Sequence, residues 1–133
     1  MILSLTREVY ETFGFKNFNV EISVRDPQNK QNYFGEDSLW DTAQNALIDA
    51  AKRWGAPYKV VEGEAAYYRQ KIDIRVEDVI GRTWQLTTVQ LDYVQPENFE
   101  MEYTADDGTK QRPAVLHAAI FGSVDRFMGI LIE

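Results

Sequence analysis

Apolar and polar residues alternate from Thr83 to Tyr93, as they do in a half-buried β-strand, but the alternation changes parity halfway along. The apolar residues stand at even positions before the change and at odd positions after it: Trp84, Leu86, Val89, Leu91 and Tyr93. A strand with one buried face changes parity only where an extra residue is inserted, so we predict a β-bulge near Thr87. The bulge gives the strand one polar face, made of Gln85, Thr88, Gln90 and Asp92. Such a face suits a strand that contacts a ligand.

Period-two alternation and short apolar runs predict further strands, at residues 18–24, 58–61, 72–76 and 99–103. The run from Val115 to Phe121 is apolar on both faces, which predicts a strand in the centre of the sheet. Gly122 interrupts this run, and Ser123 is placed to cap a final helix.

Apolar residues at spacings of three and four predict two earlier helices. The first covers residues 2–13, and Gly14 is expected to end it in a left-handed conformation. Asp37 or Ser38 is expected to cap the second, which ends at Trp54.

These elements predict an α+β fold, a mainly antiparallel β-sheet with helices packed on one face. A chain of 133 residues, of which 44% are hydrophobic, is long enough to bury one core and too short for two. No repeat or linker divides the sequence, so we interpret residues 1–133 as a single domain.

Composition excludes several kinds of function. The formal charge is -7 and no basic cluster exists, so this segment is a poor nucleic-acid binder by itself. The absence of cysteine excludes disulfides and thiolate catalysis, and a single histidine excludes a metal site built from several imidazoles. No stretch is apolar over the roughly 18 residues that a membrane helix needs, and no secretory signal is visible, so a cytoplasmic location is expected.

Several short blocks occur in a distinctive order along the chain. They are TFGF at 12–15, Trp40-Asp41, YY followed by KID at 67–73, GRTWQ at 81–85, TVQLDY at 88–93, Arg112-Pro113 and GSVDRFMGILIE at 122–133. In these blocks the chain resembles the catalytic domain of threonyl-tRNA synthetase, a class II aminoacyl-tRNA synthetase. The similarity covers essentially the whole chain and is closest after Glu62.

The resemblance implies a ligase of protein biosynthesis that condenses threonine with ATP and transfers the threonine to tRNA. Its cofactors would be ATP with magnesium, and zinc. Residues 1–133 would be the C-terminal part of the catalytic core, including motif three. Motifs one and two would precede Met1, and the anticodon-binding domain would follow Glu133.

The resemblance also implies an ATP- or adenylate-binding group, consisting of Arg126, Gln85, Thr88, Gln90 and Ser123. Arg126 corresponds to the arginine that stacks on adenine, a task that suits a planar and permanently charged guanidinium. Without the resemblance, Arg126 would be interpreted as a helix-surface residue paired with a carboxylate, and the glutamines as a solvated sheet face.

Tyr68 and Lys71 match residues of the substrate pocket. Aromatic packing explains Tyr68 equally well, and a lysine that protects a strand edge explains Lys71. His117 matches one of the family's three zinc ligands, and the chain has neither the cysteine nor the second histidine that would complete the site. In this chain we therefore favour a hydrogen-bonded histidine, with neither ATP nor zinc bound by the chain alone.

Two departures from the family pattern lie beside functional positions. Residues 68–71 read Tyr-Arg-Gln-Lys where the family has Tyr-Gly-Pro-Lys, and residues 117–119 read His-Ala-Ala where it has His-Arg-Ala. We therefore expect a fragment or truncated relative of threonyl-tRNA synthetase that is inactive as an isolated chain. The alternatives are a non-catalytic synthetase-like module that binds a nucleotide or a partner, and an enzyme completed by another chain or by dimerisation.

Overall fold

The computed structural model describes residues 1–133 and contains a five-stranded sheet in the order β2-β1-β3-β4-β7. The strands are β1 (Phe18–Val24), β2 (Tyr58–Glu62), β3 (Lys71–Glu77), β4 (Thr83–Asp92) and β7 (Val115–Ala119). Only β2 runs parallel to its neighbour β1, and the other three pairings are antiparallel. The predicted α+β fold with a mainly antiparallel sheet is therefore confirmed.

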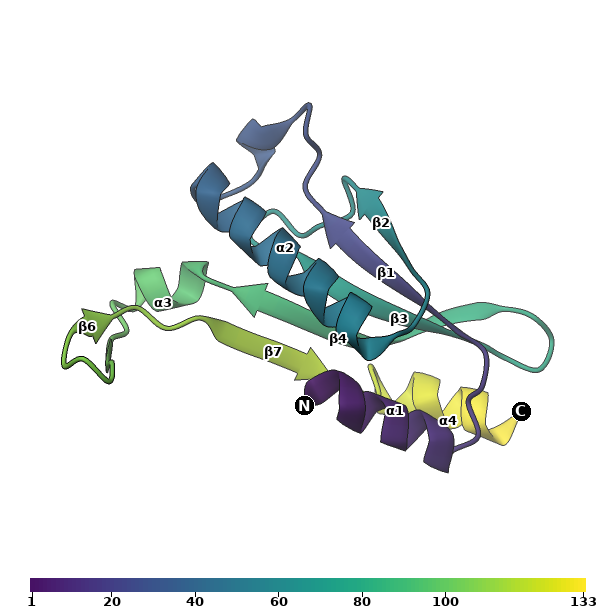
Figure 1. The fold of residues 1–133 in the computed structure, drawn as a ribbon. Helices are drawn as coiled ribbons and strands as arrows, with labels where there is room; N and C mark the ends of the chain where they lie inside the picture. Colours follow the sequence, from purple (N-terminus) through teal and green to yellow (C-terminus); the bar gives the residue numbers. More distant parts are fainter.

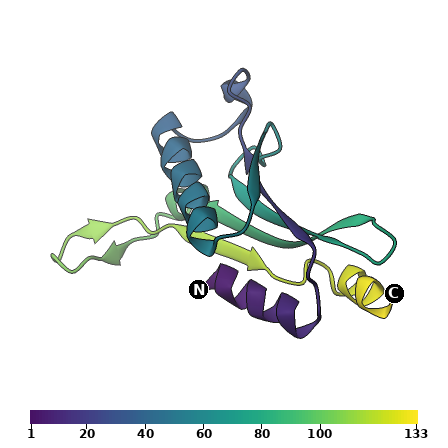
Figure 2. The ribbon, with the colours of Figure 1, turned by 45° about the vertical axis from the view of Figure 1, so that its right-hand side comes forward.

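Two helices, α1 (Ile2–Thr12) and α2 (Asp37–Trp54), cover one face of this sheet (Figures 1 and 2). Their apolar sides bury the alternate residues of the strands, since Leu47 and Ala51 of α2 share one core cluster with Ile72 and Ile74 of β3. The C-terminal helix α4 (Val124–Ile132) joins the same cluster through Phe127. The opposite face of the sheet carries no helix.

The predicted bulge is present in β4. Thr87 pairs with Ile74 of β3, whereas Gln85 pairs with the next β3 residue, Arg75, so Leu86 is the extra residue. Leu86 and Thr87 are both buried. The parity change in the sequence thus correctly predicted an extra residue in the pairing of β4 with β3.

The two early helices end close to their predicted bounds. Gly14 and Gly55 follow them with φ angles of 79° and 75°, in the left-handed region. The predicted cap of α2 is wrong, because Glu36 occupies that position and no side chain caps the helix. Asp37 instead lies in the first turn, where it pairs with Lys30 at 3.0 Å and with Arg25.

The region after β4 differs most from the sequence prediction. Residues 99–103 do not form the predicted strand, because a short helix α3 (Val94–Asn98) occupies the preceding segment and only a small hairpin follows. The hairpin pairs β5 (Tyr103–Thr104) with β6 (Lys110–Gln111) and projects from the body in Figure 1. Two-residue strands are too short to leave a reliable alternation in the sequence.

The predicted central position of the last strand is wrong. β7 pairs with β4 alone and forms an edge of the sheet. Apolar residues on both faces of a strand indicate what packs against those faces. They give no information about which strands pair with its two edges. Within this chain Leu116 is 49% exposed. None of the four helices is both long enough and apolar enough to span a membrane.

A buried hydroxyl pair connects α1 to the bulge. Tyr10 is 1% exposed, its Oη lies 2.8 Å from Thr87 Oγ1, and burial raises the pKa of this phenol. Tyr10→Phe is expected to lower the free energy of unfolding by about 1 kcal/mol, because Thr87 keeps its second partner, the Ile120 carbonyl. Urea denaturation measures this, with Tyr103→Phe in the exposed hairpin as the control that should change little. Equal losses in both variants would contradict this role of Tyr10.

Candidate functional site

Polar side chains of three adjacent strands meet on the face of the sheet that no helix covers. The registers place Asp73 of β3 opposite Thr88 of β4, and Lys71 opposite Gln90. On β7, His117 stands opposite Gln90, so it lies on the same face. The structure therefore brings together most of the residues that the sequence had assigned to a ligand site.

Asp73 lies at the centre of this polar face and is 2% exposed. Its Oδ1 accepts hydrogen bonds from Gln85 Nε2 and Thr88 Oγ1, each at 2.8 Å. Its Oδ2 lies 2.6 Å from Lys71 Nζ. One carboxylate thus holds three of the predicted site residues. Because β3 lies between β1 and β4, the interpretation of Lys71 as a strand-edge residue is wrong.

The N-terminal end of α4 meets the bulge of β4. Ser123 caps the helix as predicted, accepting a hydrogen bond from the backbone N–H of Arg126 at 3.2 Å. The Arg126 side chain then reaches β4, where Nη1 donates to the backbone carbonyl of Gln85 at 2.7 Å. The guanidinium is exposed. The alternative of a helix-surface arginine paired with a carboxylate is wrong, since the partner is a backbone carbonyl.

A second buried carboxylate, Asp92, lies at the far end of β4. It is 0% exposed, and its Oδ2 lies 3.0 Å from His117 Nε2 and 3.5 Å from Arg69 Nη1. Its Oδ1 accepts from the backbone N–H groups of Val94 and Gln95, at 2.9 and 3.2 Å. Burial by itself would raise the pKa of Asp92, but these hydrogen bonds and the Arg69 charge outweigh it and hold the pKa below its usual value.

The residues around His117 do not fit a zinc ion. Catalytic zinc sites use three protein ligands, and nowhere do three His, Cys, Asp or Glu side chains converge as a metal site would require. The imidazole instead bonds to Asp92, whose carboxylate is also next to the Arg69 guanidinium. A positive charge at this point disfavours a divalent cation.

Tyr68 lies outside the polar face, in a small pocket that it lines with Trp40 of α2 and Leu91 of β4. Its ring packs edge-on against Tyr67, with centroids 4.5 Å apart, and the guanidinium carbon of Arg69 lies 4.0 Å from its ring centroid. Arg69 also donates to Gln90 Oε1 at 3.3 Å. Tyr68 thus packs as an aromatic residue and reaches the site through Arg69.

Three residues of the site were missed by sequence reasoning. Asp73 could have been found, because it alternates with Ile72 and Ile74 and must therefore share a face with Gln85 and Thr88. Asp92 was placed on the polar face without a role. Arg69 was noted only as a departure from the family pattern, and its 9% exposure results from the path of the loop before β3.

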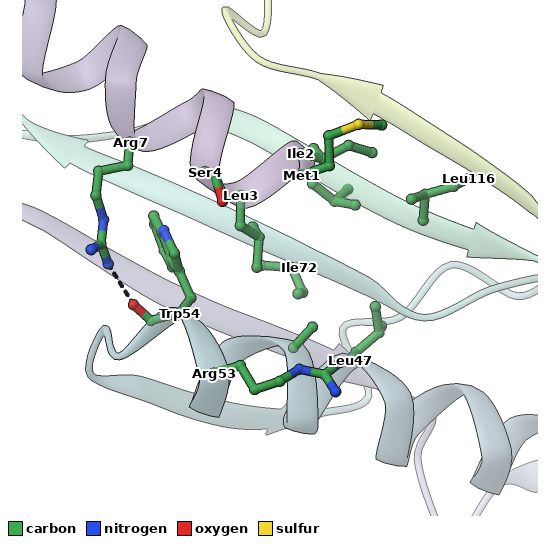
Figure 3. Close-up of a pocket in the computed structure, with 12 residues that line it drawn as sticks. Met1, Ile2, Leu3, Ser4, Arg7, Leu47, Arg53, Trp54, Ile72 and Leu116 are labelled. Atoms are coloured by element: carbon green, nitrogen blue, oxygen red, sulfur yellow. Dashed lines mark hydrogen bonds between the residues drawn. The ribbon is translucent and has the colours of Figure 1, made fainter.

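The opposite face contains an apolar groove between α1 and α2, with a volume of about 490 Å³ (Figure 3). Ile2, Leu47, Trp54, Ile72 and Leu116 are among its lining residues, most of which are hydrophobic. The polar side chains of the groove are Ser4, Arg7 and Arg53. It contains no carboxylate or amide side chain, and the sheet separates it from Asp73 and Gln85. We therefore assign the candidate site to the polar face.

Comparison with known proteins agrees with this fold. A family model, described as "tRNA synthetase class II core domain (G, H, P, S and T)", matches residues 2–133. The chain therefore belongs to the class II tRNA synthetase core-domain family.

Its relatives within that family are of the threonine type. A threonine–tRNA ligase of Acidobacterium capsulatum is 47% identical over 131 residues, covering 98% of this chain and 19% of the ligase. Another from Bacteroides thetaiotaomicron is 45% identical over 132 residues, covering 99% of this chain and 20% of the ligase. The chain thus spans about a fifth of the length of the curated relatives it matches.

A solved structure shares the architecture closely. The crystal structure described as the RNA binding domain of threonyl-tRNA synthetase from Cryptosporidium parvum superposes with a TM-score of 0.88 at 32% identity. The match covers 98% of this chain and 32% of that one. Sequence and structure comparisons therefore agree on the threonyl-tRNA synthetase type.

Proposed function

We propose that this chain forms one wall of the ATP and adenylate pocket in the catalytic core of a threonyl-tRNA synthetase. The observation that carries this proposal is the hydrogen bond from Arg126 to the Gln85 carbonyl, which holds the α4 arginine beside the polar face of β4. In this arrangement the exposed guanidinium is free on one side to stack on the adenine ring. Gln85, Thr88 and Gln90 then line the pocket from below.

Lys71 and Tyr68 extend the proposed wall toward the amino-acid end of the substrate. Lys71 Nζ is held 2.6 Å from Asp73 and is 20% exposed, so its charge is fixed in place and can still reach an anionic group of the ligand. Ser123 supports the pocket indirectly, because its cap fixes the first turn of α4 from which Arg126 projects.

We propose further that the isolated chain does not activate threonine. The residues around His117 do not fit zinc, and the chain covers only about a fifth of the curated ligases. The remaining groups of the pocket would come from the rest of such a protein, from a second copy or from another chain. A cytoplasmic location, as for other enzymes of protein synthesis, belongs to the same proposal.

Contact with tRNA is proposed to lie outside this segment. One solved relative is described as an RNA binding domain, but the present chain has a formal charge of -7, which opposes binding to phosphates. The proposed contribution of this chain to the reaction is therefore to bind the nucleotide.

The sequence alone favoured no ATP binding, but because Arg126 is held beside the polar face we expect the purified chain to bind ATP weakly. Arg126→Ala should weaken this binding about tenfold, since a stacked guanidinium contributes on the order of 1–2 kcal/mol. Isothermal titration of ATP into the purified chain measures this, with Arg53→Ala on α2 as the control that should bind like the unchanged chain. The same samples should show no threonine-dependent ATP–pyrophosphate exchange. Equal ATP affinity in the two variants would refute the role of Arg126, and full exchange activity would refute the incomplete site.

A further inference from the structure

The side-chain amide of Gln85 is held in a single orientation. The amide nitrogen faces inward, where Nε2 donates to Asp73 Oδ1 and to Thr88 Oγ1, each at 2.8 Å. The Oε1 atom of Gln85 has no hydrogen-bonding partner in the protein and is not among the buried unsatisfied atoms. Gln85 therefore presents an acceptor, and not a donor, to whatever occupies the polar face.

Thr88 reinforces this polarity. Its hydroxyl has one proton, which it donates to Asp73 Oδ1 at 2.8 Å while accepting from Gln85. No proton of Thr88 is left for a ligand. The segment of β4 from Gln85 to Thr88 thus offers acceptors alone.

The origin of this arrangement is Asp73. An ionised carboxylate only accepts hydrogen bonds, so a buried one obliges the groups around it to turn their protons inward. Asp73 cannot turn away from Gln85 and Thr88, because Lys71 Nζ holds its other oxygen at 2.6 Å. Without this carboxylate, the Gln85 amide could rotate by half a turn and exchange its donor and acceptor.

We propose that Asp73 is a positioning residue that makes the pocket select ligands carrying a hydrogen-bond donor opposite Gln85. The inference rests on the proposed function, in which the ligand is ATP. The donors that ATP offers are its ribose hydroxyls and its 6-amino group. One of these is bound by Gln85 Oε1, and an analogue lacking that donor leaves the acceptor unpaired.

The test compares ATP with three analogues, each lacking one donor: 2′-deoxyATP, 3′-deoxyATP and inosine triphosphate. For the unchanged chain, one analogue is expected to bind about tenfold more weakly than ATP. In Asp73→Asn, whose single side-chain oxygen cannot serve both Lys71 and Gln85, the same analogue and ATP should bind within about twofold of each other. Retention of the original ratio in Asp73→Asn, or no discrimination by the unchanged chain, would overturn the proposal.

Glu21→Gln is the matched control. Glu21 lies on the same face but pairs with Lys59 and Arg75, at 2.8 and 2.9 Å, and it has no contact with Gln85. Removing its charge should leave the ratio between ATP and the analogue unchanged. Loss of discrimination in this variant too would show that charge on the face, rather than the Asp73 contact, sets the preference.

A second measurement needs no ligand and separates this inference from the proposed function. In ¹H–¹⁵N spectra, the Gln85 side-chain amide protons should exchange slowly with solvent in the unchanged chain and in Glu21→Gln. In Asp73→Asn they should exchange at least about tenfold faster, because the acceptor of one proton is lost. If the unchanged chain does not bind ATP, the proposed function fails. Unaltered Gln85 exchange in Asp73→Asn would overturn the present inference whatever ATP does.

Discussion

Gly122→Ala is expected to lower the free energy of unfolding by about 3 kcal/mol, which is a severe loss for a domain of this size. Gly122 has a φ angle of 65°, a left-handed conformation that strains any residue with a Cβ atom. A Cβ added here would also lie 2.6 Å from the backbone oxygen of Leu86, the extra residue of the bulge. Neither backbone can give way without separating α4 from β4. Urea denaturation followed by tryptophan fluorescence measures the loss.

Gly129→Ala provides the control within the same helix. No atom lies within 4 Å of a Cβ built on Gly129, and alanine favours the helix interior by about 0.8 kcal/mol. This variant should therefore be slightly more stable than the unchanged chain. If Gly122→Ala unfolds at the same urea concentration as Gly129→Ala, the close approach of the loop to the bulge is wrong.

The core of the sheet could be predicted from the sequence because each face of a strand is recorded by alternate residues. The parity change between Leu86 and Val89 located the bulge to within one residue, and with it the common face of Gln85, Thr88 and Gln90. The helices could be predicted equally well, since α2 buries residues at helical spacing: Trp40, Ala43, Leu47 and Ala51. These are local patterns that depend on one element and the face it buries.

Features that depend on the order of the strands in the sheet could not be predicted from such patterns. The side chains of Val115–Ala119 do not indicate that this strand pairs with β4 alone. Strands pair through backbone hydrogen bonds, which do not depend on the type of side chain. The strand predicted at residues 99–103 was wrong for a related reason. Residues 99–103 have an alternating apolar pattern, yet Phe99 is 75% exposed and ends a short helix.

In the candidate site, too, the residues on strands could be predicted from the sequence and the residue in a loop could not. Side chains on the strands were assigned correctly to one face, and their contacts followed from the register. Arg69 lies in a loop, and its approach to Asp92 and Gln90 depends on the loop path rather than on any periodicity. The sequence could place Asp73 on the polar face, but it could not show which groups donate hydrogen bonds to this carboxylate. The direction of these hydrogen bonds became clear only from the structure.

Asp92→Ala is expected to lower the free energy of unfolding at neutral pH by about 3 kcal/mol, because it leaves a buried positive charge without its counter-ion. The Arg69 side chain is 9% exposed, its Nε already lacks a partner, and only Gln90 would remain to accept from Nη1. The backbone N–H groups of Val94 and Gln95 would lose their acceptor as well. Changing Arg69 to Met in the same chain should restore part of the loss, since an apolar residue needs no counter-ion. Failure of this second change to restore stability would mean that the ion pair is not the cause.

The pH dependence of the loss provides an independent check on Asp92. Its pKa in the folded chain lies below the value in the unfolded chain, so the unfolded state binds the proton more readily in the acid range. The stabilisation from this carboxylate is therefore complete above the unfolded pKa of about 4 and is lost as the pH falls through the folded pKa. Other carboxyls with lowered pKa, such as Glu21 and Asp78, destabilise the unchanged chain and the variant equally in acid. The difference in unfolding free energy between the unchanged chain and Asp92→Ala should consequently shrink between pH 7 and pH 3. A difference that stays constant over that range would show that Asp92 contributes shape and hydrogen bonds but no charge.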